Sequence, residues 1–185
     1  VENESAEASE RYAQAMDAFQ GGNRPEAEKI WTELSKSSSK GYRALALNHL
    51  GGLALADNKT AEAVKLFDEA AEAAPSDVLG DLARLKSAFA LLDTAPYKDL
   101  EARLTPMIEE GRPYRAQARE ALAFAKLMAG NTKGAREDFV VLSNSLDSAE
   151  GARQRAQAAM AMIDSGAAKA VPAAAKAAAA LPPPM

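Results

Sequence analysis

The sequence contains no cysteine, a single histidine and few aromatic residues, which make up 5% of its 185 residues. Without cysteine the chain forms no disulfides, zinc-thiolate sites or thiol nucleophiles, and the absence is compatible with the cytosol and with an oxidising compartment. His49 has no second histidine and no Ser-His-Asp spacing around it. We therefore expect His49 to pack or to line a groove rather than to bind metal or catalyse a reaction.

Several other signatures are missing. The sequence contains no run of about 20 apolar residues, so it predicts no membrane span. The chain begins with the acidic stretch VENESAEASE instead of the basic start of a signal peptide. We expect the chain as given to be soluble, and the sequence leaves open whether an upstream anchor or signal was removed. No glycine-rich phosphate-binding motif occurs, and the carboxylates have the spacing of solvated helix faces. We expect no cofactor, no metal and no enzymatic activity.

The net charge is −4, and the sequence pI is about 5.2. A chain with this balance has no large positive field to attract phosphates, so nucleic acid is not an expected partner. Hydrophobic residues make up 48% of the sequence and are mostly alanine and leucine. This composition favours closely packed helices.

One stretch, residues 47–75, has a recognisable repeat pattern. Leu50-Gly51 and a small Ala54 lie on a first helix, and a second helix carries an A-x3-F pattern before a closing proline. This resembles the tetratricopeptide repeat. Small residues on the first helix let the two antiparallel helices approach closely, and a large aromatic residue fills the remaining space. The second-helix positions of the pattern are Ala63, Phe67, Ala70 and Pro75.

The same register recurs along the chain. Its first-alanine positions are Ala27, Ala63, Leu100 and Ala135, spaced 36, 37 and 35 residues apart, close to the period of about 34 for these repeats. The predicted hairpins span about residues 8–40, 47–75, 81–110 and 114–147, of which the third is degenerate. We predict an all-α fold: a tetratricopeptide-like right-handed superhelix of about four antiparallel helix hairpins.

The two ends of the chain lie outside the four predicted hairpins. Residues 150–163 predict an amphipathic helix that caps the array. Beyond Gly166 the composition becomes rich in alanine and proline, which predicts a flexible tail without a fold. We therefore expect an N-terminal extension over 1–7, formerly linked to a membrane anchor if one existed, a repeat domain over 8–165 and a tail over 166–185.

Two surfaces are candidate binding sites. The first helices of stacked hairpins face the concave side of the superhelix, where apolar side chains predict a groove for a segment of a partner protein. Some of these residues have an alternative interpretation as ordinary hairpin core. The groove positions are Tyr12, Met16, Phe19, Asn48, Leu55, Leu85, Phe89, Leu92, Glu120, Phe124 and Met128. Arg112, Arg115 and Arg119 form a basic cluster that predicts contact with an acidic partner, with pairing to neighbouring carboxylates as the alternative.

The order of these features resembles one repeat subfamily. Ser39 to Ala46 reads SKGYRALA, and Gly130 to Arg136 reads GNTKGAR. Together with the acidic start, the degenerate third repeat and the short final helix, they look like the YfgM-type ancillary subunit of the SecYEG translocon. The resemblance covers about residues 5–163.

That resemblance implies a scaffold of the bacterial cell envelope, with the repeat domain on the periplasmic side of the inner membrane. The partners that it implies are translocon subunits or a membrane-anchored periplasmic chaperone, and the implied role is to assist secreted or outer-membrane proteins. The alternatives are a self-associating structural or assembly factor, such as a homodimer, and a generic soluble repeat adaptor in the cytoplasm.

Overall fold

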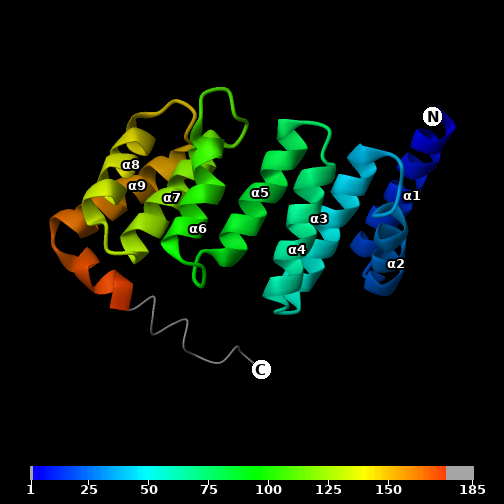
Figure 1. The fold of residues 1–185 in the computed structure, drawn as a ribbon, viewed down its shortest axis with the longest axis horizontal. Coiled ribbons are helices and arrows are strands. Elements are labelled where there is room, and N and C mark those ends of the chain that lie inside the picture. The colour runs from blue at the N-terminus through cyan, green and yellow to red at the C-terminus, as the bar shows by residue number, and fades with distance from the viewer. Residues whose placement is uncertain (1, 174–185) are drawn as a thin grey trace. The chain divides into compact units, whose positions relative to one another are not determined.

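The computed structural model describes residues 2–173, and within that range the chain is helical and contains no strand (Figure 1). This confirms the predicted all-α class. The helices are α1 (Glu2–Gln20), α2 (Arg24–Leu34), α3 (Lys40–Ala56), α4 (Thr60–Ala73), α5 (Asp77–Leu91), α6 (Tyr97–Leu104), α7 (Arg115–Met128), α8 (Thr132–Asn144) and α9 (Glu150–Asp164), with 3-10 helices η1 (Thr105–Ile108) and η2 (Ala167–Ala170).

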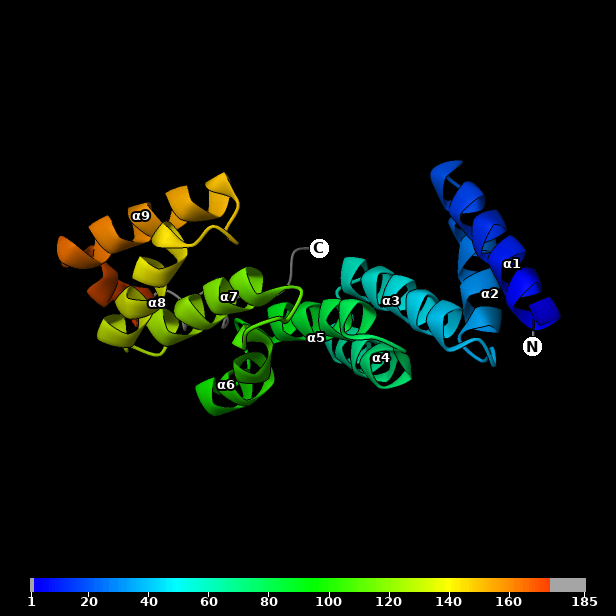
Figure 2. The same ribbon diagram turned by 90° about the horizontal axis from the view of Figure 1, so that it is seen from above.

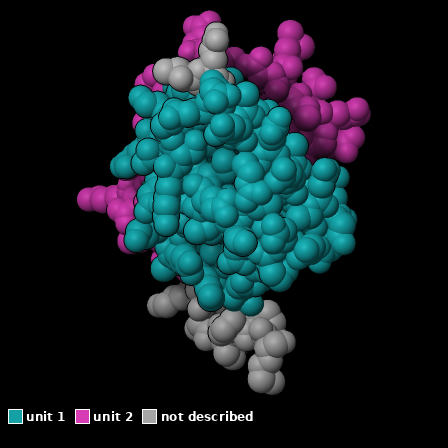
Figure 3. Space-filling model, turned by 90° about the vertical axis from the view of Figure 1, so that its right-hand side faces the viewer, with its two compact units in different colours: residues 1–90 teal, residues 91–185 magenta. Residues whose placement is uncertain are grey.

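The chain forms two compact units, residues 1–90 and 91–185, coloured separately in Figure 3. The division falls at the end of α5, inside the range that we predicted as one repeat domain over 8–165. In the first unit α1 packs against α2, α3 packs against α4, and α2 packs against α3. In the second unit α8 packs against both α7 and α9, and α6 packs against α7 (Figure 2).

The predicted register is also the pattern of burial. Twelve residues before each register residue lies a small, buried residue, and four residues after it lies a large, buried one. The small set is Ala15, Gly51, Ala88 and Ala123, and the large set is Trp31, Phe67, Leu104 and Phe139. Each repeat therefore buries one small and one large residue at these positions.

Gly51 shows why a small residue is needed. A Cβ atom at Gly51 would lie 2.6 Å from Cε1 of Phe67, a distance that real Cβ atoms do not show. The Phe67 ring thus occupies the space that the glycine leaves free within the same hairpin. Gly52 is different, because a Cβ atom there would meet nothing within 4 Å, so packing explains Gly51 and not Gly52.

Three hairpin turns share one geometry. Gly22, Asn58 and Gly130, each five residues before a register residue, have φ of 82°, 60° and 87°. Glycine and asparagine are the residues that adopt this left-handed conformation at least cost. The next residue donates its backbone N–H to the carbonyl five residues before it in every case, at 2.8 to 2.9 Å.

The connection between α5 and α6 lacks both parts of that turn. The equivalent positions carry Ala95, which has no positive φ, and Pro96, which has no N–H to donate. The two helices of the predicted third hairpin belong to different units, α5 to the first and α6 to the second. The predicted register residues Leu100, Leu104 and Met107 are nevertheless all buried.

The C-terminal part of the described chain packs on the second unit. Ala156 and Ala159 of α9 join the core around Phe139, as expected of a helix that covers an apolar face. The segment from residue 166, which we expected to have no fold, begins with η2, and its Ala168 is buried in the same core. Residues 174–185 of that predicted tail lie outside the described residues.

Candidate functional site

His49 lies in an aromatic cluster of the first unit. Its ring stacks on Trp31 with centroids 4.4 Å apart and an angle of 4° between the planes. The Tyr12 hydroxyl lies 2.8 Å from His49 Nε2, within hydrogen-bond distance, and Tyr12 also contacts Tyr42. Phe19 packs against the Trp31 indole, with centroids 5.5 Å apart. These contacts tie α1, α2 and α3 together, so His49 occupies a packing position.

The electrostatics of this cluster favour neutral groups. Burial, and to a smaller extent the positive charge of Lys86, lower the pKa of His49 below its usual value. Burial, followed by the effect of Tyr42, raises the pKa of the Tyr12 phenol. A neutral imidazole stacks on Trp31 without burying a charge.

The predicted groove residues of the first unit divide into exposed and buried ones. Phe19 on α1, Leu55 on α3 and Phe89 on α5 are 45%, 41% and 48% exposed. By contrast, Leu85 and Asn48 are buried. The Asn48 amide finds no hydrogen-bond partner among the described residues, which makes it a costly group to bury.

Tyr12 and Met16, which we also placed in the groove, are partly buried against the core around Trp31. They contribute to the hairpin core while keeping part of their surface open. The first helices of this unit therefore present exposed apolar side chains as well as partly buried ones.

The predicted groove residues of the second unit have partners within that unit. Phe124 packs edge to face on Phe139, with centroids 5.2 Å apart. Glu120 accepts hydrogen bonds from Arg155 of α9 at 2.6 and 3.1 Å. Leu92 and Met128 line a cavity of about 300 Å³ together with Tyr97 and Pro172. These residues leave less apolar surface exposed than Phe19, Leu55 and Phe89 do.

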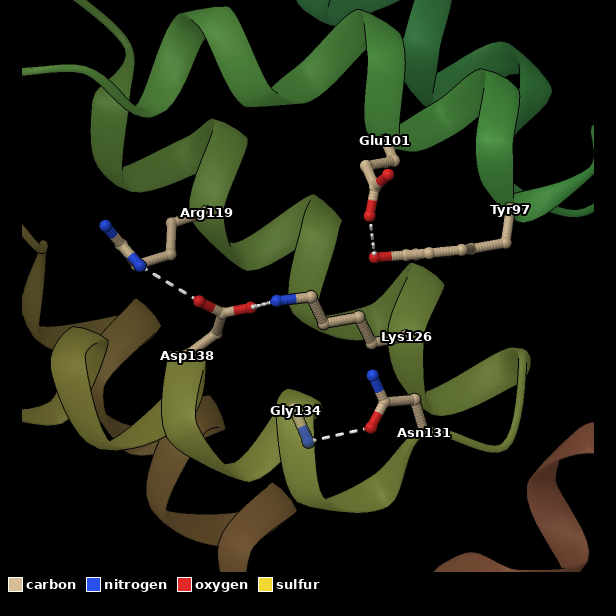
Figure 4. Close-up of polar contacts among 7 residues, drawn as sticks. All are labelled: Tyr97, Glu101, Arg119, Lys126, Asn131, Gly134 and Asp138. Carbon is tan, nitrogen blue, oxygen red and sulfur yellow. Dashed lines mark hydrogen bonds and ion pairs between the residues drawn. The ribbon is translucent and has the colours of Figure 1, made fainter.

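A buried carboxylate, Asp138 of α8, lies between two cations of α7 (Figure 4). Arg119 Nη1 is 2.9 Å from Oδ1, and Lys126 Nζ is 2.7 Å from Oδ2. Because both carboxylate oxygens are bonded, the buried charge is compensated. This network joins α7 to α8 and is a structural one.

Tyr97, at the start of α6, donates a hydrogen bond of 2.8 Å to Glu101 (Figure 4). Burial, then this hydrogen bond, raises the pKa of the Tyr97 phenol to about 12. At neutral pH the phenol is therefore protonated and acts as a donor. Figure 4 also shows the Asn131 side chain accepting the Gly134 N–H at 2.9 Å, which caps α8.

The predicted basic cluster lies around the N-terminus of α7. Arg115 is paired with Asp147, and Arg119 with Asp138. Arg112 and Arg115 line a polar cavity of about 510 Å³ with Glu110 and Asp147. Pairing with neighbouring carboxylates, the alternative interpretation of this cluster, therefore accounts for Arg115 and Arg119, while both side chains remain partly exposed.

The described part of the chain was searched for two further features, a metal site and a membrane-spanning helix. No group of three or more histidine, cysteine, aspartate or glutamate residues within it is arranged to hold a metal ion. None of its helices combines the length and apolar character that a membrane span requires.

Comparison of the sequence with protein-family models, with curated proteins and with solved structures found no match.

Sequence reasoning missed Asp138 and the cavities beside α7. Asp138 lies three residues after the register position Ala135, and from the sequence it is indistinguishable from the solvent-exposed charges of an amphipathic helix. Arg119 and Lys126 on the preceding helix compensate the charge of the buried carboxylate. A basic pair at i and i+7 facing a single acidic residue on the next helix is the signal that identifies such a network.

Proposed function

We propose that this protein is a non-enzymatic scaffold that binds a protein partner through the exposed faces of its first helices. The observation that carries the proposal is the exposure of Phe19, Leu55 and Phe89 on α1, α3 and α5. The three side chains lie on the first helices of three consecutive predicted repeats, and exposed apolar surface of this kind supports an interaction site.

The repeat register adds a second support. Phe19 and Leu55 occupy the same position, eight residues before Ala27 and Ala63. Three residues earlier the register carries Met16 and Gly52, and Gly52 has open space where a side chain would be. A partner side chain fits an open position of this kind, and the adaptable thioether of Met16 suits an irregular apolar contact.

The proposed architecture is a tetratricopeptide-like superhelix, supported by the recurring small and large core positions and by the shared turn geometry. The proposed setting is the bacterial cell envelope, on the periplasmic side of the inner membrane, with a translocon subunit or a periplasmic chaperone as the partner. The sequence motifs at residues 39–46 and 130–136 support this setting through their resemblance to YfgM-type subunits.

The test is affinity capture with the full chain carrying Leu55→Glu and Phe89→Glu. Two carboxylates on the exposed apolar face remove the hydrophobic contact and add a desolvation cost, so we expect captured partner to fall at least about tenfold. Capture is quantified from envelope extracts by mass spectrometry. Because 41% of Leu55 and 48% of Phe89 are exposed, we expect the variant to keep its helical circular dichroism.

The control is Ala61→Glu, which adds one of these two negative charges at an exposed position of the second helix α4 and leaves capture unchanged. Equal capture by the wild type and the double variant overturns the proposal. Sedimentation of the wild type is the accompanying measurement. If the wild type sediments as a dimer and the double variant as a monomer, the exposed face serves self-association instead of partner binding.

A further inference from the structure

The contact between α1, α2 and α3 in the first unit holds the only histidine and the only tryptophan of the sequence. The His49 ring of α3 stacks on Trp31 of α2 with centroids 4.4 Å apart. The Tyr12 hydroxyl of α1 lies 2.8 Å from Nε2 of the same ring. One side chain of α3 therefore contacts both helices of the first hairpin.

This contact suits a neutral imidazole better than a charged one. Trp31, which covers one face of the ring, is 1% exposed. Burial raises the pKa of the Tyr12 phenol, so the hydroxyl keeps its proton at neutral and mildly acidic pH and can donate it to a neutral Nε2. A protonated imidazole carries hydrogen on both nitrogens and accepts none. Protonation of His49 thus ends this donation and places a charge at a partly buried position.

Within the described residues, the groups that face His49 from the neighbouring helices do not compensate a positive charge. Lys86 of α5 is itself positive, and its charge acts on the imidazole. α1 contributes the Tyr12 phenol, and α3 contributes the Tyr42 phenol beside it. α2 contributes the uncharged indole, and from α4 the centroid of the Phe67 ring lies 6.0 Å from the Lys86 ammonium. A second positive charge at this place is therefore repelled rather than paired.

Another polar contact between α2 and the end of α3 responds to a different pH range. Arg24 of α2 and Asp57, directly after α3, form an exposed ion pair at 2.6 Å. The hydrogen bond from Arg24 lowers the pKa of the Asp57 carboxyl below its usual value of 3.8. Stability from such a carboxylate is lost as the pH falls through that lowered pKa. Between about pH 7.5 and 5 the ion pair therefore stays charged, whereas a histidine titrates in this range.

We propose that His49 is a pH-sensitive contact of the first unit, and that its protonation in mildly acidic solution weakens the attachment of α1 and α2 to α3. Burial, followed by the positive charge of Lys86, lowers the pKa of His49 below its ordinary value of 6.5. The unfolded chain therefore takes up a proton at a higher pH than the folded chain does. The stability that neutral His49 contributes is fully present above about pH 6.5 and is lost as the pH falls toward the folded pKa.

The partner-binding face proposed above shares this contact. Phe19 of α1 is 45% exposed and packs against the same Trp31 indole, with centroids 5.5 Å apart. Loosening of α1 and α2 from α3 changes the position of Phe19 relative to Leu55 of α3. Acidification is therefore expected to weaken partner capture, and this consequence alone rests on the proposed function.

The first experiment follows the imidazole of the purified full chain by NMR from about pH 8 to 5. Because the sequence has one histidine, a single set of imidazole signals reports His49. We expect a titration midpoint below the ordinary histidine value of about 6.5. Emission of Trp31, the only tryptophan, changes with the same midpoint, since its ring stacks on the imidazole.

Two lysine variants test the origin of the lowered midpoint. Lys86→Gln removes the positive charge that acts on the imidazole, so the midpoint rises. Lys65→Gln removes a positive charge at an exposed position of α4 and leaves the midpoint unchanged.

Urea denaturation at a series of pH values, followed by Trp31 emission, measures the stability of the first unit. In the wild type the unfolding equilibrium constant rises by up to about tenfold for each pH unit between the unfolded and the folded pKa of His49. His49→Gln keeps hydrogen-bonding groups at this position but has no proton to gain, so the part of the rise that comes from His49 is absent. The comparison uses the pH dependence of each protein, so the lost ring stacking of the variant does not enter it.

An imidazole midpoint at or above about 6.5 shows that attraction of the cation to the Trp31 face outweighs burial, and it overturns the inference. Equal pH dependence of unfolding in the wild type and in His49→Gln, or equal midpoints with the two lysine variants, overturns it as well. The NMR titration needs no variant at position 49, so it decides the matter even if His49→Gln does not fold. These measurements use no partner, so their failure leaves the proposed function intact, and failure of partner capture leaves them unaffected.

Discussion

The α3–α4 hairpin and the α5–α6 segment have the same core register but a different connection. Both place a small buried residue twelve positions before the register residue, Gly51 in α3 and Ala88 in α5. The first is closed by Asn58 in the left-handed conformation and by a hydrogen bond from the Lys59 N–H. In the second, Ala95 has no positive φ and Pro96 has no N–H to donate.

The comparison separates two roles of the repeat sequence. The buried positions determine which face of each helix enters the core, and the α5–α6 segment retains them. The left-handed turn belongs to the α3–α4 hairpin, whereas the chain divides into its two units at residue 90, shortly before Ala95 and Pro96. A degenerate repeat can therefore keep its core pattern and still mark a boundary.

The largest expected effect concerns the close contact that is particular to α3. Gly51→Ala places a methyl group 2.6 Å from the Phe67 ring, and we expect it to destabilise the protein by about 1–2 kcal/mol in spite of alanine's higher helix propensity. Gly52→Ala, with open space around its Cβ, stabilises by about 0.5–1 kcal/mol. Urea denaturation of both variants measures the difference.

A third variant checks the cause of that loss. In the Gly51→Ala background, Phe67→Leu costs less than it does alone, because the smaller side chain relieves the clash. Simple additivity of the two substitutions, or a gain in stability with Gly51→Ala, contradicts the contact between Gly51 and Phe67.

A smaller effect tests the turns. Gly22→Ala has free space for its methyl group but forces alanine to a φ of 82°, so we expect a loss of about 1 kcal/mol. Ala95→Gly, at the equivalent position between α5 and α6, relieves no positive φ and gains nothing. Thermal unfolding of the two variants makes the comparison, and a stabilising Ala95→Gly argues against the difference between the turns.

Much of the fold follows from local sequence. The Ala63, Phe67 and Ala70 pattern predicted the second hairpin, because the small and aromatic residues that define it act within a few positions of one another. The division after Ala90 was not predicted, since it depends on which neighbour each helix packs against.

The candidate sites were less accessible to sequence reasoning. Exposure of Phe89 and burial of Leu85, four residues before it on the same helix, depend on the neighbouring helices rather than on helical periodicity. Burial of Asp138 likewise depends on the neighbouring helix α7, whose Arg119 and Lys126 pair with it. In the tail, η2 was missed because alanine-rich composition carries no periodic signal, and Ala168 is fixed by packing against the core around Phe139.

The most direct measurement is photocrosslinking in cells of the source organism from a photoreactive residue at Phe89, compared with the same residue at Ala61 on α4. A scaffold that binds through its first helices gives one or more discrete heterologous protein adducts from position 89, absent from position 61, among them a translocon subunit or an envelope chaperone. Identical adducts from both positions, or adducts of the chain with itself alone, contradict the proposed function.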